Sequence, residues 1–400
     1  RALLTSTRAD RPCGVPESQN IMQAGRIVLL GIAGALLSIL FAAILGPQLA
    51  IPLEVDVNLT LRGKRILITG GSSGVGLACA KDLAARGATV YLTGRNQQRT
   101  DAAASSLPAA GHEAHRGFAL DLTDLDSVQA FTSQLIDSMG VRGLDAMILN
   151  AGMFYDATTT GPATVTMGMS KQDRLIAANH LGHFKLLTLL LDLLTAWGTR
   201  VVFTSSISHH LGTAAGVLPG QAAWEEGIVP GGETVSFIAA FRLYGNSKLM
   251  NVLTAKKLQR LFDDESNPTT ASVVVSTPGF VASNIGSDDR SPTRFNPLDY
   301  LPLARSSADG GRVLAFAVTV EHTLARDKML QPYWIWEEGA RFFFKNSVWR
   351  GCFFNFVQEM LLQRLTPAGT IYAFATSDPS HDEHLQDQLW AWSLEATKEK

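Results

Sequence analysis

The hydrophobic and polar positions of this 400-residue chain alternate between short apolar runs and longer stretches with helical spacing. Short runs of β-branched and apolar residues that end in turn residues predict buried β-strands. Such runs occupy residues 65–69, 89–93, 116–120, 144–149, 200–204, 272–276 and 368–374. Because helical patterns separate most of them, we predict an α/β fold: a doubly wound, mostly parallel sheet of about seven strands with helices on both faces.

The region before the first run has a different pattern. Residues 27–53 contain no charged side chain, and the uninterrupted part through Leu45 approaches the length that crosses the hydrocarbon of a bilayer. Since this stretch is too long for the usual core of a signal peptide, we expect an N-terminal membrane anchor. A cleaved or buried apolar helix is the alternative. Basic residues on both sides leave the orientation open. Residues 1–26 are expected to be a disordered or targeting segment.

Residues 324–366 form a second unusual stretch, in which Trp, Tyr and Phe are interleaved with Arg and Lys. We interpret it as an aromatic insertion in the C-terminal part of the domain. Aromatic and basic side chains together suit a helix in the lipid interface, a cap over a substrate pocket, or a dimer surface. Beyond it, a docking helix is predicted by the helical spacing of Leu385, Leu389, Trp390 and Leu394.

Composition narrows the classes of function. With 46% hydrophobic residues the chain can bury a large core, and its net charge of −2 argues against nonspecific nucleic-acid binding. Three scattered cysteines are too few for a disulfide framework or a zinc site. His180 and His183 lie one helical turn apart, but no carboxylate or cysteine cluster completes a ligand set, so we expect no metal.

The first apolar run leads into a glycine-rich turn and then a helical pattern. Glycines allow positive φ angles and let the backbone approach a pyrophosphate, while the following helix presents free N–H groups and its positive dipole end. The order strand, glycine turn, helix predicts a dinucleotide site; a glycine turn without cofactor is the alternative. The expected contacts of this loop with the cofactor are Gly70, Ser72, Ser73, Gly74, Val75 and Gly76.

Thr69 and the glycines match the pattern T-G-x-x-x-G-x-G, and from about residues 63 to 317 the chain resembles the short-chain dehydrogenases/reductases. No Lys-Ser/Thr pair follows the loop, so kinase or ATPase chemistry is disfavoured. The resemblance implies a Rossmann-type domain, which we assign to residues 54–400. Segments 179–184 and 205–212 are most similar to retinol dehydrogenases and related membrane-bound reductases, which act on lipid aldehydes, alcohols and ketones.

Arg95, at the end of the second run, favours NADP(H). An arginine there suits a 2′-phosphate, whereas an acidic residue would bind the ribose hydroxyl of NAD. A solvent-facing arginine is the alternative. The resemblance implies that Asp121-Leu122 contacts the adenine, although the acid also suits a helix N-terminus. The remaining contacts that it implies are Asn150, Ala151 and Gly152 beside the nicotinamide ribose, and Pro278, Gly279, Val281 and Ser283 over the nicotinamide, with Ser283 in place of a threonine.

Tyr244 and Lys248 are four residues apart, so on a helix they share one face. Hydride transfer between a carbonyl and a nicotinamide needs a group that gives or takes a proton at the oxygen. A phenol has a reference pKa of about 10, and a nearby ammonium lowers that pKa because it favours the phenolate. We predict that Tyr244 is the acid/base and Lys248 its tuner and a ribose contact. A half-buried tyrosine with a solvated lysine is the alternative.

The fifth apolar run delivers Ser205 and Ser206 to the sheet edge where ligands bind in open α/β folds. The resemblance implies that Ser206 holds the substrate oxygen. It also implies that Asn179, within the apolar helix 175–194, shapes a water relay to Lys248, whereas a purely structural asparagine is the alternative. No G-x-S-x-G elbow surrounds the serines, so a serine hydrolase has no support.

These features predict an NADP(H)-dependent oxidoreductase that interconverts a carbonyl and an alcohol on a lipophilic substrate, such as a retinoid, sterol or polyprenoid. A membrane location is expected, with the endoplasmic reticulum favoured, and a homodimer stays open. The alternative is a catalytically idle scaffold or redox-sensing module that keeps its cofactor site at a membrane.

Overall fold

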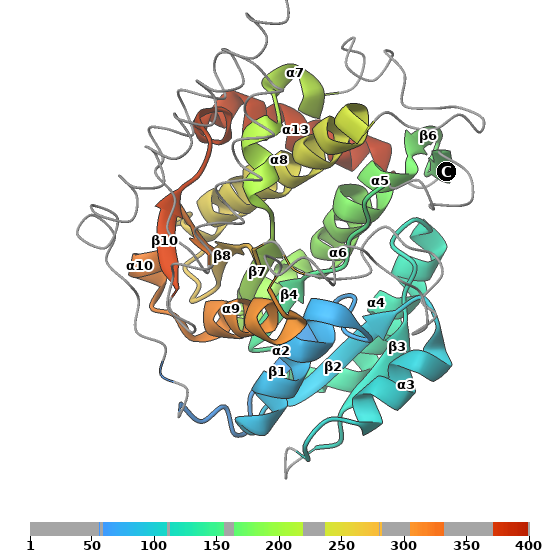
Figure 1. Cartoon of the computed structure of the whole chain (residues 1–400), viewed down its shortest axis with the longest axis vertical. Helices are drawn as coiled ribbons and strands as arrows, with labels where there is room; N and C mark the ends of the chain where they lie inside the picture. The colour runs from blue at the N-terminus through green and yellow to red at the C-terminus, as the bar shows by residue number, and fades with distance from the viewer. Residues whose placement is uncertain are drawn as a thin grey trace, which may run out of the picture.

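The computed structural model describes residues 56, 59–109, 113–155, 164–218, 237–279, 281, 305–331 and 371–398. One sheet organises them. Its strands are β1 (Arg65–Ile68), β2 (Thr89–Gly94), β3 (Arg116–Ala119), β4 (Ala146–Leu149), β7 (Arg200–Thr204), β8 (Ser272–Ser276), β9 (Lys328–Gln331) and β10 (Tyr372–Ala375). They lie in the order β10-β9-β8-β7-β4-β1-β2-β3 (Figure 1). Seven strands are parallel, and only β10 pairs antiparallel, with β9. The predicted doubly wound parallel sheet is confirmed.

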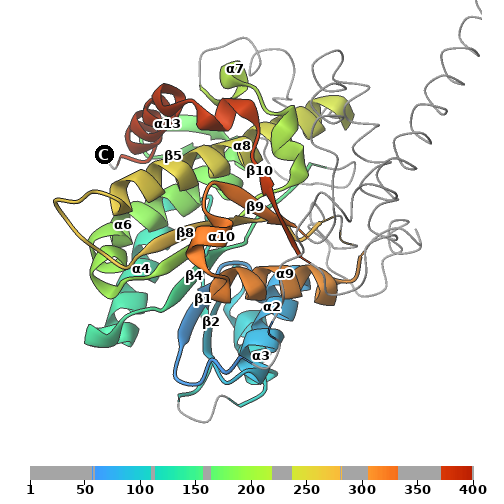
Figure 2. The ribbon, with the colours of Figure 1, turned by 90° about the vertical axis from the view of Figure 1, so that its left-hand side faces the viewer.

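Helices cover both faces of the sheet (Figure 2). One face packs α2 (Gly74–Ala85), α3 (Gln97–Ser105) and α9 (Ser307–Thr319) against alternate strand residues, among them Ile66 and Val274. The other face packs α4 (Leu125–Met139), α6 (Gly182–Trp197) and α8 (Phe237–Phe262) against the residues between them. Both faces of a parallel sheet are thereby buried, which explains why its strands read as nearly continuous apolar runs.

The shorter elements connect this frame. They comprise η1 (Gly140–Arg142), the antiparallel hairpin of β5 (Thr164–Met167) and β6 (Ser170–Asp173), α5 (Arg174–Ile176), the π-helical turn η2 (Ala177–Leu181), η3 (Ile207–Leu211), α7 (Ala214–Val217), α10 (His322–Ala325), η5 (Asp378–His381) and α13 (Glu383–Ala396). The predicted docking helix is α13: Leu385 and Leu389 are buried and Trp390 is half-buried, whereas Leu394 is 47% exposed.

The structure shifts the end of the sheet relative to the sequence prediction. The run at 368–374 was expected to supply the last strand, after an insertion that begins near residue 324. Instead β9 is the seventh parallel strand and lies inside that stretch, while β10 adds an antiparallel edge. The sequence of β9 is only Lys-Met-Leu-Gln, too short to stand out as an apolar run. The interruption therefore falls between β9 and β10, and its residues 332–370 lie outside the described part.

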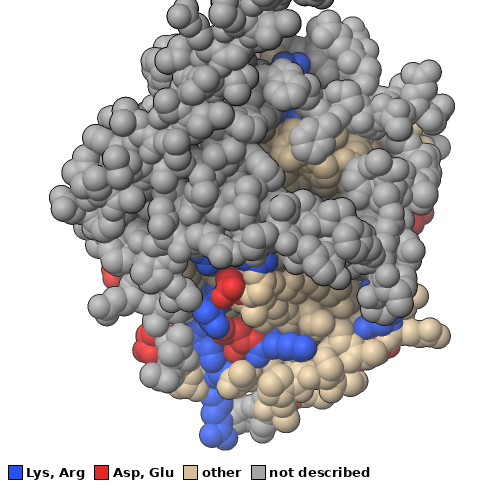
Figure 3. Space-filling view, in the orientation of Figure 1, with Lys and Arg blue, Asp and Glu red and all other residues tan. Residues whose placement is uncertain are grey.

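Three other expectations also concern residues that the structure leaves undescribed. The segments 1–26 and 27–53 belong to that part of the sequence, and so does the aromatic core of the insertion. Among the residues that the structure describes, no helix combines the length and apolar character needed to span a bilayer. In the described part of the face shown in Figure 3, Lys and Arg side chains lie beside Asp and Glu side chains.

Candidate active site

The predicted site residues gather at one edge of the sheet, because parallel strands end on the same side. The glycine loop follows β1, the Asn150 turn follows β4, the serine pair follows β7 and Pro278 lies shortly after β8. Helix α8 brings Tyr244 and Lys248 to the same region, since the lysine ammonium bonds to the last residue of β7. The fold thus assembles side chains that are far apart in the sequence.

The glycine loop has the close contacts that require glycine. Gly70 has φ +65°, and a Cβ there would lie 2.9 Å from the Cα of Ala151. A Cβ on Gly76 would collide with the carbonyl oxygen of Gly70. Gly74 has φ +55°, and no atom of the described residues lies within 4 Å of the position that its Cβ would take. Gly70 and Gly76 therefore allow close packing of the loop, whereas Gly74 has no close neighbour among the described residues.

The start of α2 fits an anionic group. Ser73 at the N-cap position is extended, and its side chain makes no capping bond to the helix. The first N–H groups of a helix carry a partial positive charge that favours phosphate. With the open position at Gly74, these residues fit the pyrophosphate of a dinucleotide. Ser72 lies alongside, since a Cβ on Gly94 would be 2.7 Å from its hydroxyl oxygen.

The hydroxyl of Thr69 joins this loop to the Asn150 turn. Its Oγ1 accepts hydrogen bonds from the backbone N–H groups of Asn150 (2.9 Å) and Ala151 (3.0 Å). The Asn150 amide in turn donates to the carbonyl of Thr69 at 2.9 Å. The two turns that border the proposed cofactor site therefore form one rigid unit. The sequence pattern had marked Thr69 only as part of the motif.

The remaining cofactor candidates lie at the rim. Arg95 is exposed just after β2, Leu122 is buried, and Asp121 accepts bonds from the backbone N–H and hydroxyl of Thr123. Helix α4 starts later, with Asp124 as its N-cap, so Asp121 stabilises a turn before the helix rather than capping it. Pro278, Gly279 and Val281 are half-buried, Gly279 has φ +79°, and Ser283 falls outside the described residues.

Tyr244 and Lys248 share one face of α8, as the spacing predicts. The lysine Nζ lies 5.5 Å from the centroid of the tyrosine ring. Lys248 is only 3% exposed, and its ammonium donates to the carbonyl of Thr204 at 3.0 Å. Burial disfavours the charged form and lowers the pKa of Lys248 to about 8. The lysine is therefore still mostly protonated at neutral pH, and the alternative of a solvated lysine is wrong.

Asn179 lies in the π-helical turn between α5 and α6 and is fully buried. Its Oδ1 accepts from the N–H of Met153 at 2.7 Å, and its Nδ2 donates to the carbonyl of Met153 at 3.0 Å. Nδ2 also donates to the hydroxyl of Ser247, which donates to the carbonyl of Tyr244. The asparagine side chain thus ties the turn after β4 to the tyrosine helix.

Gly152 shows how close these groups lie to one another. A Cβ at that position would be 3.3 Å from Oδ1 of Asn179 and 3.6 Å from Nζ of Lys248. The Asn150-Ala151-Gly152 turn, the asparagine and the lysine therefore converge on one point. Any larger residue at Gly152, which is exposed, would project toward both polar groups.

The two serines differ in what they contact. Ser205 is 2% exposed, and its hydroxyl donates to the carbonyl of Lys248 at 3.0 Å. Ser206 is half-buried at the N-cap of η3, where its oxygen accepts from the N–H of Ser208 at 3.2 Å. Ser205 is therefore committed to holding α8 against β7, and Ser206 is the more accessible hydroxyl.

The buried histidines bind neighbouring chain segments. His183 contacts Oγ1 of Thr69 through Nε2 at 2.8 Å, and His180 contacts the hydroxyl of Ser393 at 2.8 Å. Burial lowers the pKa of each to about 3, so both are neutral. Within the described ranges, no group of three His, Cys, Asp or Glu side chains could hold a metal ion. Sequence spacing gave no signal for these contacts.

Phe154 and Phe241 were not predicted as site residues, yet Phe154 contacts the ring of Tyr244 and Phe241 contacts Phe154. The rings of Phe154 and Tyr244 meet edge to face with centroids 5.4 Å apart, and those of Phe154 and Phe241 lie 5.0 Å apart. Both phenylalanines are half-buried. Tyr244 is thus the first of three aromatic rings in contact, followed by Phe154 and then Phe241.

Comparison with known proteins gives consistent matches. A family model described as short chain dehydrogenase matches residues 64–218. Protochlorophyllide reductase from Daucus carota is 31% identical over 303 residues, which cover 71% of this chain and 73% of that protein. Retinol dehydrogenase 11 from Mus musculus is 34% identical over 234 residues, which cover 57% of this chain and 65% of that protein. A solved structure of an uncharacterised Mycobacterium paratuberculosis protein aligns with a TM-score of 0.57 and 25% identity, covering 85% of this chain and 96% of that one.

The buried lysine leads to a testable pH dependence. The pKa of Lys248 is about 8 in the folded chain and about 10.4 in an unfolded chain, so between these values the unfolded state binds more protons. Stability must therefore rise with pH across this window. In urea titrations of the cofactor-free protein, the free energy of unfolding relative to Lys248→Met should increase by about 2 kcal/mol from pH 8 to pH 10. The same substitution at the exposed Lys81 corrects for general pH effects. If this difference in the free energy of unfolding does not change with pH, burial does not lower the pKa of Lys248.

Proposed function

Because the chain belongs to the short-chain dehydrogenase/reductase family of oxidoreductases, which bind a nicotinamide cofactor, we propose that it interconverts a carbonyl and an alcohol on a lipophilic substrate with NADP(H). The main support for this proposal is that the predicted catalytic residues lie together at one edge of the sheet. Lys248 lies 5.5 Å from the Tyr244 ring and bonds to Thr204, two residues before Ser206, while Asn179 ties the neighbouring turn to the same helix.

Each residue has a distinct role in this proposal. In the reductive direction the phenol of Tyr244 gives its proton to the substrate oxygen as negative charge builds there, and in the oxidative direction the phenolate takes it back. The hydroxyl of Ser206 donates a hydrogen bond to the same oxygen. The Lys248 ammonium favours the phenolate form of the tyrosine and contacts the nicotinamide ribose. When bound, the cofactor supplies or accepts the hydride.

Asn179 acts through position. Its amide holds Met153, next to the Asn150-Ala151-Gly152 turn, and reaches the tyrosine helix through Ser247. It therefore fixes the distance between the proposed ribose contacts and the lysine ammonium, and the proposed water relay to Lys248 would start from this turn. A buried asparagine with all these partners also satisfies its own polar atoms, so its structural and functional roles coincide.

The preference for NADP(H) rests on Arg95. This exposed arginine follows Gly94 at the end of β2, where the 2′ position of the adenosine ribose is expected to lie in a Rossmann-type fold. A guanidinium can bind a phosphate through two parallel hydrogen bonds. No acidic residue stands between β2 and Asp101 to compete for that position.

The lipophilic substrate class is supported by the surface around the tyrosine. The ring of Phe154 contacts Tyr244, and Phe241 contacts Phe154. Partly buried Met153 and Leu218 pack against the same hydrophobic cluster as Tyr244. Apolar and aromatic linings with few polar groups are typical of sites for hydrophobic ligands. The name of retinol dehydrogenase 11 points to a retinoid as one substrate of this kind.

Removal of the Tyr244 hydroxyl provides the direct test. Tyr244→Phe should lower turnover by roughly 10²–10⁴-fold, because general acid catalysis contributes that much. The assay is NADPH oxidation by detergent-solubilised protein with retinal, a polyprenal, a ketosteroid and short aldehydes. Tyr91→Phe is the matched control, since it removes a hydroxyl bound to Glu113. NADPH binding without turnover on any substrate, in the wild type as well, would favour an idle scaffold or redox-sensing module.

Reversal of charge at Arg95 tests the cofactor choice. Arg95→Glu should raise the KM for NADPH roughly tenfold to a hundredfold, because a charged hydrogen bond is replaced by like-charge repulsion. The KM for NADH should change little. Arg116→Glu makes the same change at the N-terminal end of the neighbouring strand β3, whereas Arg95 follows the C-terminal end of β2. This control should affect neither cofactor. Equal losses for NADPH and NADH would contradict the proposal.

A membrane location is proposed from the sequence of residues 27–53, with the endoplasmic reticulum as the favoured organelle. The full chain should remain in the membrane pellet after carbonate extraction. Leu37→Asp with Ile39→Asp should release it into the soluble fraction, because each buried acid costs roughly 2.5–3.5 kcal/mol of insertion. Wild-type protein recovered in the supernatant would refute an anchor. A homodimer is tested on the same preparation by light scattering.

A further inference from the structure

We propose that His209 is a positioning residue for Ser206: it holds the backbone of the serine to the chain segment that follows β10. The inference rests on the proposed function, because it requires that Ser206 contacts the substrate oxygen. It assigns a role to a histidine three residues beyond the serine that no sequence motif for catalysis had singled out. The contacts of the two ring nitrogens carry the argument.

The ring of His209 bridges two backbone groups. Its Nδ1 lies 2.7 Å from the carbonyl oxygen of Ser206, and its Nε2 lies 3.1 Å from the backbone nitrogen of Ser377. A carbonyl only accepts, so Nδ1 carries the proton, and a backbone N–H only donates, so Nε2 is bare. These partners fix one neutral tautomer. The side chain is 0% exposed, and burial lowers its pKa to about 4, which keeps the ring neutral through the physiological range.

The bridge acts on the backbone of the catalytic candidate itself. The carbonyl of Ser206 accepts from both Nδ1 and the backbone N–H of His209, the latter at 3.0 Å. With two donors on one oxygen, the peptide plane that follows Ser206 has a defined orientation. The serine side chain leaves the same Cα atom, and its hydroxyl accepts from Ser208. The orientation of that peptide therefore helps to set where the hydroxyl points.

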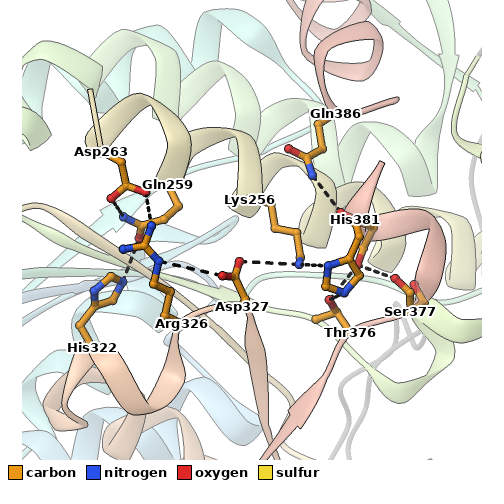
Figure 4. Close-up of polar contacts among 11 residues, drawn as sticks. Lys256, Gln259, Asp263, His322, Arg326, Asp327, Thr376, Ser377, His381 and Gln386 are labelled. Carbon is orange, nitrogen blue, oxygen red and sulfur yellow. Dashed lines mark hydrogen bonds and ion pairs between the residues drawn. The ribbon is translucent and has the colours of Figure 1, made fainter. Parts of the chain in front are cut away.

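The other end of the bridge is firmly anchored (Figure 4). The hydroxyl oxygen of Ser380 lies 2.6 Å from the carbonyl oxygen of Ser377 and 2.7 Å from the hydroxyl oxygen of Thr376. Thr376 contacts Nε2 of His381 at 3.2 Å, and Nδ1 of His381 lies 3.1 Å from the ammonium of Lys256. The polar network thus runs from Ser377 to a buried lysine without a break among these side chains.

Lys256 belongs to α8, the helix that carries Tyr244 and Lys248. The segment 376–381 is therefore bound to the tyrosine helix at one point and to the serine loop at another. His209 closes this connection. In the proposed reaction both hydroxyls must reach one substrate oxygen, and a misplacement of about 1 Å can cost a hundredfold in rate. A fixed link between the two elements accounts for the burial of a histidine at this position.

Two substitutions remove the bridge from opposite ends. His209→Asn can retain a donor toward Ser206 but withdraws the acceptor from Ser377. Ser377→Pro removes the N–H without touching the serine loop, and the φ angle of −60° at Ser377 suits proline. Each should lower kcat/KM for the carbonyl substrate roughly tenfold to a hundredfold, mainly through kcat, while the Kd for NADPH, measured by fluorescence, changes less than about twofold.

A double-mutant cycle with Ser206→Ala separates positioning from a merely structural role. If His209 acts through the serine, His209→Asn should reduce activity much less in the Ser206→Ala background than in the wild type. His322→Asn, which removes a histidine bound to Gln259, is the matched control and should leave kcat/KM within about twofold of the wild type. Thermal unfolding of every variant shows whether the fold is retained.

The outcomes are distinct. Wild-type kinetics in both His209→Asn and Ser377→Pro would overturn the proposal, and so would equal fold-losses from His209→Asn with and without Ser206. If Ser206→Ala itself has full activity, the assigned role of the serine fails, and the positioning role fails with it. A large coupling between His209 and Ser206, with unchanged NADPH affinity, supports both.

Discussion

The burial of one ammonium group constrains the whole site. Lys248 is almost inaccessible to solvent, and a buried cation is costly unless hydrogen-bond acceptors replace its water. The carbonyl at the end of β7 provides one, and the hydroxyl of Ser205 returns a bond to the lysine's own carbonyl. These two hydrogen bonds therefore hold helix α8 against the end of strand β7. Ser206 lies two residues beyond Thr204, and Tyr244 lies one helical turn before Lys248, so both are close in sequence to this contact.

Around this contact, the loops of the site are held mainly by side chains that bond to backbone groups. Thr69 binds two N–H groups after β4, Asn179 binds both backbone atoms of Met153, and His209 binds Ser206 and Ser377. Each bond is buried or partly buried, where an unsatisfied polar group would cost free energy. Loops at the end of a sheet lack the regular backbone hydrogen bonds that pair neighbouring strands. Their order here comes from polar residues that reach across from neighbouring strands and helices.

Sequence patterns predicted what depends on local spacing. The strands, the glycine turn and the shared face of Tyr244 and Lys248 follow from periodicity and chain geometry, and the structure reproduces them. β9 was not recognised because only Met329 and Leu330 form its apolar centre. The contacts of His183 and His209 could not be predicted, since their partners are 114 and 168 residues away. Such contacts depend on tertiary packing, and the local sequence around a histidine does not indicate them.

The antiparallel edge of the sheet connects the residues before and after the interruption. The chain leaves the sheet at Gln331 and returns at Tyr372, which pairs directly with it in the antiparallel register. The described residues on either side of 332–370 are thus paired with each other. The interruption leaves the parallel strands undisturbed. The returning strand then leads straight to Ser377, so the residues after the interruption complete the support of the serine loop rather than forming a separate appendage.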